Sequence, residues 1–96
     1  MRLKARTDDN QKLIVEQLRK LGVSVAVTSM MGKGFPDLVL GYQNKNFLVE
    51  LKDGAKPKSQ KGLTMDEAKF FTAWKGQCDK CESLEEVCRI IGIKLL

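Results

Sequence analysis

Two short runs of strand-forming residues, joined by a turn, constrain the fold of this chain more than any other feature. Residues 36–42 (PDLVLGY) and residues 46–52 (NFLVELK) both place side chains alternately on two faces, as β-strands do. The intervening residues 43–45, Gln-Asn-Lys, favour a turn. The sequence therefore predicts a β-hairpin near the middle of the chain.

The polar side chains of this hairpin gather on one face. Asp37 shares a face with Val39 in the first run, and Glu50 shares a face with Lys52 in the second. If the strands pair, the two carboxylates and the lysine converge at one end of a small sheet. Such a group can hold a divalent cation and a polarised water, as phosphodiester cleavage requires. Because Glu50 lies among apolar residues, its charge is costly unless a cation or a salt bridge to Lys52 offsets that cost.

The remaining elements follow from periodicity and capping signals. Asp8 and Gln11 have capping-box spacing at the start of a first helix, and Gly22 ends that helix. Residues 53–62 form a polar loop, and Thr64 with Glu67 opens a second helix. The expected order is αβββαβα, with helices at 8–21, 64–75 and from 84 onward, and strands at 23–30, 36–42, 46–52 and 77–81. This is an α/β fold in which helices flank a small mixed sheet.

Length and charge limit the class of protein. The chain has 96 residues, which is one domain (1–96) with one core. Its net charge of +5 is compatible with a polyanionic partner, although such a surplus is also common in ordinary proteins. No apolar run reaches the ~18–20 residues that span a bilayer, and the N-terminal residues lack the apolar stretch of a secretory signal. We therefore expect no membrane partner.

Several kinds of site are excluded because the chain has no histidine, and others are disfavoured by the number and spacing of its three cysteines. The chain has 0 histidines, which excludes Ser-His and Cys-His pairs and Cys2His2 zinc sites. Cys78, Cys81 and Cys88 are an odd number, which favours a reducing cytoplasm. A structural zinc site needs four ligands, and the C-x-x-C of residues 78–81 together with Cys88 supplies only three. We therefore expect the cysteines to be buried in a strand and a helix. A hydrolase built on this chain must use carboxylates, lysine and a metal.

The motifs together resemble those of a known nuclease family. GKGFPDL at 32–38, VELKDG at 49–54 and LTMDE at 63–67, followed by the aromatic residues of the second helix, are similar to the VRR-Nuc family of the PD-(D/E)xK superfamily. The similarity runs from about residue 8 to about residue 91, and it is greatest to the small stand-alone form carried by bacteriophages and prophages. It implies a restriction-endonuclease-like core and a Mg²⁺- or Mn²⁺-dependent DNA endonuclease. It also implies a homodimer that cuts branched DNA, such as four-way (Holliday) junctions, in the bacterial cytoplasm.

The resemblance assigns roles to the hairpin residues. Asp37, Glu50 and the backbone carbonyl of Leu51 would be the metal ligands, because Mg²⁺ and Mn²⁺ prefer oxygen; the use of the carbonyl is implied by the resemblance alone. Lys52 would orient the attacking water or stabilise the charge of the transition state. The alternative for Lys52 is a structural ion pair with Glu50 or Asp53.

The first helix is expected to contribute a glutamine instead of the superfamily's commoner carboxylate. At about 100° per residue, Glu16 lies about 160° from the apolar stripe of Ile14, Leu18 and Leu21 and should face solvent. Gln11 falls on the stripe side, so we place it in the site, where it would bind metal through water or hydrogen-bond another ligand. Asp8 is a secondary candidate, although an N-cap role suits it better.

Glu67 lies on the same helical face as the aromatic residues that follow it, Phe70, Phe71 and Trp74. That direction suits a contact with Lys52 or with the bound water. The alternative is that Glu67 forms a capping box with Thr64, and the two roles are compatible. The three aromatic side chains are expected in the core and not as platforms for stacking bases.

Basic loops flank the two motif segments. Lysines on these loops suit a phosphate backbone, and Gly32 and Gly34 would let the chain approach it closely. The alternative is a solvated, charged loop. The candidate DNA-binding residues are Lys33, Lys56, Lys58 and Lys61. A non-catalytic DNA-binding module on the same loops is the second functional hypothesis. The apolar C-terminal residues, 90–96, suit either a dimer interface or a final strand.

Overall fold

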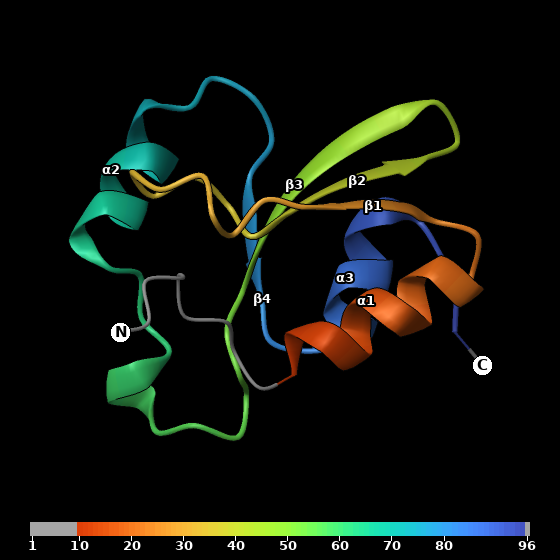
Figure 1. The fold of residues 1–96 in the computed structure, drawn as a ribbon, viewed down its shortest axis with the longest axis horizontal. Helices are drawn as coiled ribbons and strands as arrows, with labels where there is room; N and C mark the ends of the chain where they lie inside the picture. The colour runs from red at the N-terminus through yellow and green to blue at the C-terminus, as the bar shows by residue number, and fades with distance from the viewer. Residues whose placement is uncertain (1–9, 96) are drawn as a thin grey trace.

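A computed structural model describes residues 10–95 of the chain, and its elements follow the expected order αβββαβα (Figure 1). Four strands form one mixed sheet in the order β1-β2-β3-β4. β1, β2 and β3 are antiparallel neighbours, whereas β4 runs parallel to β3. The elements are α1 (Gln11–Lys20), β1 (Ser24–Val27), β2 (Leu38–Tyr42), β3 (Lys45–Leu51), the 3-10 helix η1 (Lys58–Gln60), α2 (Met65–Ala73), β4 (Asp79–Cys81) and α3 (Leu84–Ile91). The predicted α/β fold is confirmed.

The hairpin of β2 and β3 is tighter than expected. Gln43 and Asn44 have positive φ angles of 52° and 64°, and Lys45 pairs with Tyr42 as the first residue of β3. Two consecutive left-handed residues form the turn that matches the twist of antiparallel strands. The resulting register pairs Leu38 with Val49, so the polar faces of the two strands coincide.

The core lies on one face of the sheet, where α1 and α3 cover it together (Figure 1). The strands contribute fully buried apolar side chains, and the two helices contribute their apolar stripes. The core residues are Ile14, Val15, Leu18, Val23, Leu38, Leu40, Val49, Leu51, Cys81, Val87, Cys88 and Ile91. Cys81 and Cys88 are therefore buried free thiols, as predicted, and Cys78 is half-buried.

The first helix is shorter than predicted. Its N-cap is Asn10, without a side-chain cap bond among the described residues, and the predicted capping role of Asp8 lies outside them. The prediction that Leu21 completes the apolar stripe is wrong, because Leu21 is the C-cap and 39% exposed. Gly22 turns the chain there with a φ of 89°, and Val15 takes the inward position instead.

The first strand also ends early, at Val27 and not at residue 30. Thr28 leaves the ladder, although its N–H still donates to the Asp37 carbonyl at 2.7 Å. Met31 N–H then donates to the Thr28 carbonyl at 3.0 Å, which starts a turn. The residues that follow form a loop that packs on α2, so they are not available for a longer strand.

The second helix stands apart from the other two, at the opposite side of the molecule from α1 and α3 (Figure 1). None of residues 65–73 of α2, all of which the structure describes, is buried. The prediction that Phe70, Phe71 and Trp74 enter the core is therefore wrong: the phenylalanines are half-buried and Trp74 is exposed. The reason is that the face of β3 toward α2 presents polar side chains, whereas the apolar core is on the far side of the sheet.

The C-terminal residues do not form the final strand that was one of two expectations. Gly92 ends α3 with a φ of 95°, and residues 93–95 carry no regular structure. Ile91 is buried, and Ile90 and Ile93 pack against the core. Across residues 10–95, no helix has the length and apolar character needed to cross a membrane.

Candidate functional site

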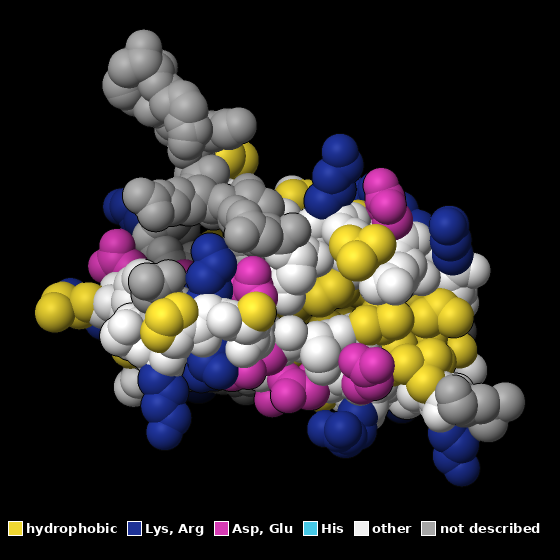
Figure 2. Space-filling model, turned by 90° about the horizontal axis from the view of Figure 1, so that it is seen from below, with side chains coloured by type: hydrophobic (Ala, Val, Ile, Leu, Met, Phe, Trp, Pro, Cys, Tyr) yellow, Lys and Arg dark blue, Asp and Glu magenta, His cyan; other side chains and the backbone are white. Residues whose placement is uncertain are grey.

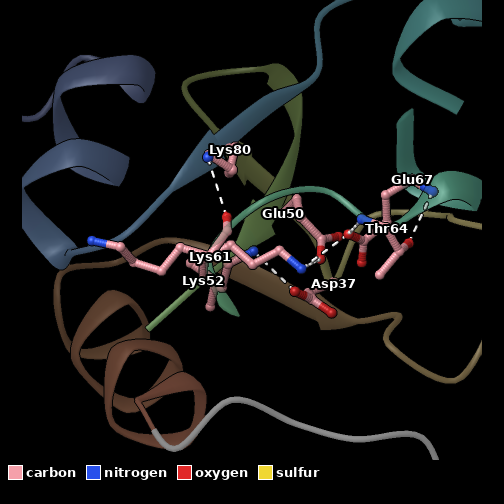
Figure 3. Close-up of polar contacts among 8 residues, drawn as sticks. Asp37, Glu50, Lys52, Lys61, Thr64, Glu67 and Lys80 are labelled. Atoms are coloured by element: carbon pink, nitrogen blue, oxygen red, sulfur yellow. Dashed lines mark hydrogen bonds and ion pairs between the residues drawn. The ribbon is translucent and has the colours of Figure 1, made fainter. Parts of the chain in front are cut away.

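Asp37 is positioned by the loop that precedes β2. Thr28 Oγ1 donates to the Pro36 carbonyl at 2.7 Å, and Pro36 is fully buried. Proline restricts its own φ angle, so the backbone entering Asp37 is held firmly. Asp37 Oδ2 in turn accepts a hydrogen bond from Leu51 N–H at 2.9 Å, which ties the two predicted motif segments together (Figure 3).

Glu50 lies in β3 and is only 3% exposed. Its Oε2 is 3.6 Å from Lys52 Nζ, whereas its Oε1 is buried with no hydrogen-bond partner among residues 10–95. The pKa of Glu50 is raised to about 9, chiefly by burial. A hydrogen bond with the Glu67 carboxyl and the charges of Asp37 and Glu67 contribute to this increase, and the charge of Lys52 opposes it. Glu50 therefore carries a proton at neutral pH when no cation is near.

Lys52 continues the same strand face, and its side chain is 11% exposed. Its Nζ donates to Glu67 Oε1 at 2.9 Å and lies near Glu50 Oε2 as well. Of the two alternative partners, the Glu50 carboxyl is the one that Lys52 approaches. Asp53 Oδ1 instead accepts from Ala55 N–H at 2.9 Å and caps the following turn.

Glu67 performs both roles that the sequence suggested. Its Oε1 accepts from Thr64 N–H at 2.9 Å while its own N–H donates to Thr64 Oγ1 at 3.2 Å, a complete capping box. The same oxygen accepts from Lys52 (Figure 3). Burial acts to raise the pKa of Glu67, but hydrogen bonds from Glu50, Thr64 and Lys52 outweigh it and lower that pKa. Glu67 is thus the ionised partner of a neutral Glu50.

The backbone of Leu51 supports the carbonyl that the resemblance proposed as a ligand. In an extended strand, the N–H and C=O groups of one residue point toward the same neighbouring strand. Because Leu51 N–H reaches Asp37, the Leu51 carbonyl is directed to the Asp37 side too. Lys52 N–H points the other way and donates to Cys81 of β4 at 2.9 Å.

These oxygens fit a hard divalent cation. Asp37, the Leu51 carbonyl and Glu50 Oε1 are the donor types that Mg²⁺ and Mn²⁺ prefer. A buried carboxyl oxygen without a partner is costly, and a cation would satisfy it. Among residues 10–95, however, no group of three or more His, Cys, Asp or Glu side chains is arranged to hold a metal.

Gln11 faces inward and Glu16 faces solvent, so the predicted helix face is confirmed. Gln11 is buried, and within the described part of the chain its Oε1 has no hydrogen-bond partner. Asn10 Nδ2, one residue earlier, donates at 3.4 Å to the carbonyl of Glu82, which directly follows β4. The first turn of α1 is therefore adjacent to the strand end that also binds the Lys52 backbone.

The four candidate DNA-binding lysines differ in their exposure and in their contacts. Lys33 and Lys58 are exposed, whereas Lys56 is half-buried. Lys61 Nζ lies 3.4 Å from both Glu82 Oε1 and the Gly54 carbonyl, so it fastens the loop to the end of β4. On the face seen in Figure 2, Lys and Arg side chains project at separate positions, with Asp and Glu side chains between several of them.

Three residues help to build the site but were not identified from the sequence. Thr28 holds the Pro36 carbonyl, and nothing in the β-branched run around it indicates this. Gly34 was expected to approach a phosphate, but it approaches α2: a Cβ there would overlap the Asp66 carbonyl and lie 2.8 Å from Glu67 N. Gln77 pairs its side-chain amide with the backbone of Leu48 at 2.7 and 2.8 Å. Of the three, only Gly34 could have been noticed in the sequence, because it lies between Gly32 and Pro36 in a glycine- and proline-rich segment.

Comparison of the chain with known proteins gave no match to a family model, to a curated protein or to a solved structure.

Proposed function

We propose that this protein is a divalent-metal-dependent deoxyribonuclease of the VRR-Nuc type. The observation that carries the proposal is the buried Glu50 oxygen without a hydrogen-bond partner, placed between Asp37 and Lys52 at the end of β3. A structural carboxylate in that position would be expected to have its oxygens satisfied. A carboxylate that binds a cation would instead have an oxygen without a hydrogen-bond partner when the cation is absent.

In this proposal Asp37, Glu50 and the Leu51 carbonyl hold Mg²⁺ or Mn²⁺. When bound, the cation supplies Lewis acidity, which lowers the pKa of water and neutralises charge on phosphate oxygens. Glu50 must release its proton first, since the pKa near 9 describes the state without a cation. Binding is therefore linked to proton release and is tighter at higher pH.

Lys52 acts on the reacting phosphate from the same strand face. Glu67 holds its ammonium group at 2.9 Å, which limits its rotamers. The lysine is thus placed to orient the attacking water or to stabilise the charge that develops on the phosphate oxygens. Glu67 is a positioning residue here, because it acts through Lys52.

The finer expectations belong to the same proposal. The substrate is DNA, with branched forms such as four-way junctions preferred, and Lys33 and Lys58 are the exposed lysines of the loops that would contact its backbone. A homodimer would bring two sites to symmetric strands. A cytoplasmic location in a bacterial host, with a phage or prophage origin, completes the expectation from the resemblance.

The test is to incubate linear, flap and four-way-junction DNA with the protein in Mg²⁺, in Mn²⁺ and in EDTA. We expect cleavage only with a cation, and a loss of more than about a hundredfold in Glu50→Gln and Asp37→Asn. Glu16→Gln is the matched control, since it removes an exposed carboxylate and should leave the rate unchanged. DNA binding without cleavage under every condition would overturn the nuclease and favour the non-catalytic binding module.

A further inference from the structure

Three aromatic side chains form a continuous stack that begins beside the candidate site and ends in solvent. The Phe35 and Phe70 rings pack edge to face, with centroids 5.3 Å apart and planes at 73°. The Phe70 and Trp74 rings lie parallel, with centroids 4.9 Å apart and planes at 17°. Phe35 precedes Pro36 and Asp37 directly in the sequence. One end of the stack is therefore fixed to the segment that positions a proposed metal ligand.

The other end of the stack is tied to the strand that carries Glu50. Trp74 is followed closely by Gln77, whose side-chain amide accepts from Leu48 N–H and donates to the Leu48 carbonyl. Leu48 and Glu50 point to the same face of β3. The Trp74 backbone N–H also donates to the Phe70 carbonyl at 2.9 Å. The segment that carries the indole is thus joined to β3 through Gln77, and the indole itself packs on Phe70.

Trp74 is 44% exposed, although it is the largest apolar side chain of the chain and its exposure to water costs free energy. One indole face rests on Phe70, and the exposure shows that the ring is not enclosed on its remaining sides. Two exposed lysines flank the stack in sequence, Lys33 before Phe35 and Lys75 after Trp74. An open aromatic ring with cationic neighbours suits a base with its phosphates, because every base has a π-face and the backbone is anionic.

We propose that Trp74 is a stacking platform for an unpaired base of the DNA strand whose phosphate lies at Asp37 and Glu50. This inference rests on the proposed nuclease function and narrows its substrate to DNA with unpaired bases near the cut, as at flaps, forks and single-stranded ends. In a paired duplex each base is already stacked and cannot reach the indole. The preference for branched DNA then has a structural cause on α2, separate from the oligomeric state.

The experiment uses the only tryptophan of the chain as its own reporter. Intrinsic fluorescence is titrated in EDTA with a single-stranded oligothymidylate, with a forked duplex that has unpaired arms, and with a blunt duplex of equal length. Anisotropy of labelled DNA measures binding in parallel. We expect strong quenching with the first two DNAs and little with the blunt duplex at equal occupancy. Equal quenching by all three, or binding of the oligothymidylate without quenching, overturns the platform.

Variants on the same segment sharpen the test. Trp74→Ala should weaken binding of the single-stranded DNA roughly tenfold, and Trp74→Phe should restore most of the affinity because a ring remains. Met65→Ala is the control, since Met65 is an exposed apolar side chain at the other end of α2. Circular dichroism establishes that each variant is folded. A fluorescence change that depends on protein concentration without DNA, together with a doubled mass in light scattering that Trp74→Ala abolishes, would instead assign this face to a second copy of the chain.

Cleavage assays separate this inference from the proposal beneath it. If Trp74→Ala cuts forked and blunt DNA in the same ratio as the unmodified protein, the platform fails and the nuclease stands. If the unmodified protein never cuts, yet unpaired bases quench Trp74, the nuclease fails and the stacking contact stands.

Discussion

At the C-terminal end of β3, both faces of the strand are buried, but they are chemically opposite. Leu51 points to the core and is 0% exposed, whereas its neighbours Glu50 and Lys52 point to the other face and are only 3% and 9% exposed. On the core face, burial stabilises the fold because apolar surface leaves water. On the site face, burial costs free energy that charge pairing offsets only in part. Burial in this protein therefore stabilises the fold on one face of the strand, whereas on the other face it acts against the charges of the candidate site.

The helices differ in the same way. α1 and α3 hold the sheet through apolar stripes, whereas α2 is joined to it by polar contacts from Glu67 and by the Phe35–Phe70 ring contact. No residue of α2, a helix described in full, is buried. An element with so few buried apolar contacts opens locally at a lower free energy than the core. The site is therefore assembled from one rigid half and one half that is easier to displace.

The largest effect we expect separates the two faces of β3 by stability. Leu51→Ala should lower the free energy of unfolding by about 2–5 kcal/mol, because it leaves a cavity in the core. Glu50→Gln should leave it unchanged or raise it slightly in the absence of metal, since it removes an ionisable group from a buried position. Urea unfolding in EDTA measures both. A loss of similar size in Glu50→Gln would show that the site face also stabilises the fold.

The second prediction concerns Glu67, the proposed positioning residue beside Lys52. Glu67→Gln should lower the cleavage rate by about ten- to a hundredfold, because Lys52 loses its ionic partner. Raising the pH of the assay should not restore the rate, because Lys52 is still present and only its position is lost. Glu85→Gln is the control, an exposed carboxylate in the first turn of α3. An unchanged rate in Glu67→Gln would reduce Glu67 to its capping role.

The same logic applies to the first helix. Gln11→Ala should slow cleavage by about tenfold if Gln11 belongs to the site, because its buried oxygen has no hydrogen-bond partner among residues 10–95. Glu16→Ala should be nearly silent, since Glu16 is exposed. Single-turnover rates compare the two, and the opposite order would remove Gln11 from the site.

A smaller effect should appear in the pH dependence of stability. The pKa of Glu50 is raised to about 9 from 4.5, chiefly by burial, so the folded state keeps a proton that the unfolded state releases. The stabilisation is complete below pH 4.5 and is lost as pH rises toward 9. In EDTA, Tm should therefore fall between pH 6 and pH 8, and Glu50→Gln should flatten this fall. The lowered pKa of Glu67 acts only below 4.5, outside that range.

Metal should reverse that trend. Because the cation competes with the proton on Glu50, Mg²⁺ or Mn²⁺ should raise Tm more at pH 8 than at pH 6. Differential scanning fluorimetry at constant ionic strength measures the shift. Equal shifts at both pH values, or equal shifts in Glu50→Gln, would contradict cation binding at this carboxylate.

The smallest effect distinguishes the two kinds of lysine on the loop after β3. Lys58→Ala should reduce the slope of log K against log salt by about 0.9 if it contacts a phosphate of duplex DNA, with no change in stability. Lys61→Ala should leave the slope almost unchanged and lower stability by about 1 kcal/mol or less, since its ammonium pairs with Glu82. Filter binding across a salt series and urea unfolding separate them. A reduction of the slope by about 0.9 in Lys61→Ala as well would show that DNA displaces this ion pair.

Local patterns determined much of the fold and part of the site. Alternation in residues 36–42 and 46–52 predicted the hairpin and the shared face of Asp37, Glu50 and Lys52, because side-chain direction has a fixed period of two in a strand. Helical geometry likewise placed Gln11 inward and Glu16 outward. Thr64 and Glu67 formed their capping box as predicted, since that motif depends only on neighbours in sequence.

What only the tertiary structure decided is which surface each helix meets. The aromatic residues of α2 have the pattern of a core-facing helix, yet they lie against the polar face of the sheet, and Trp74 remains exposed. The partners of Thr28, Gly34 and Lys61 were equally hidden, because each lies across a loop whose path no local pattern specifies. Periodicity states which side of an element is apolar, whereas the packing of distant segments determines what that side contacts and how much of it stays in water.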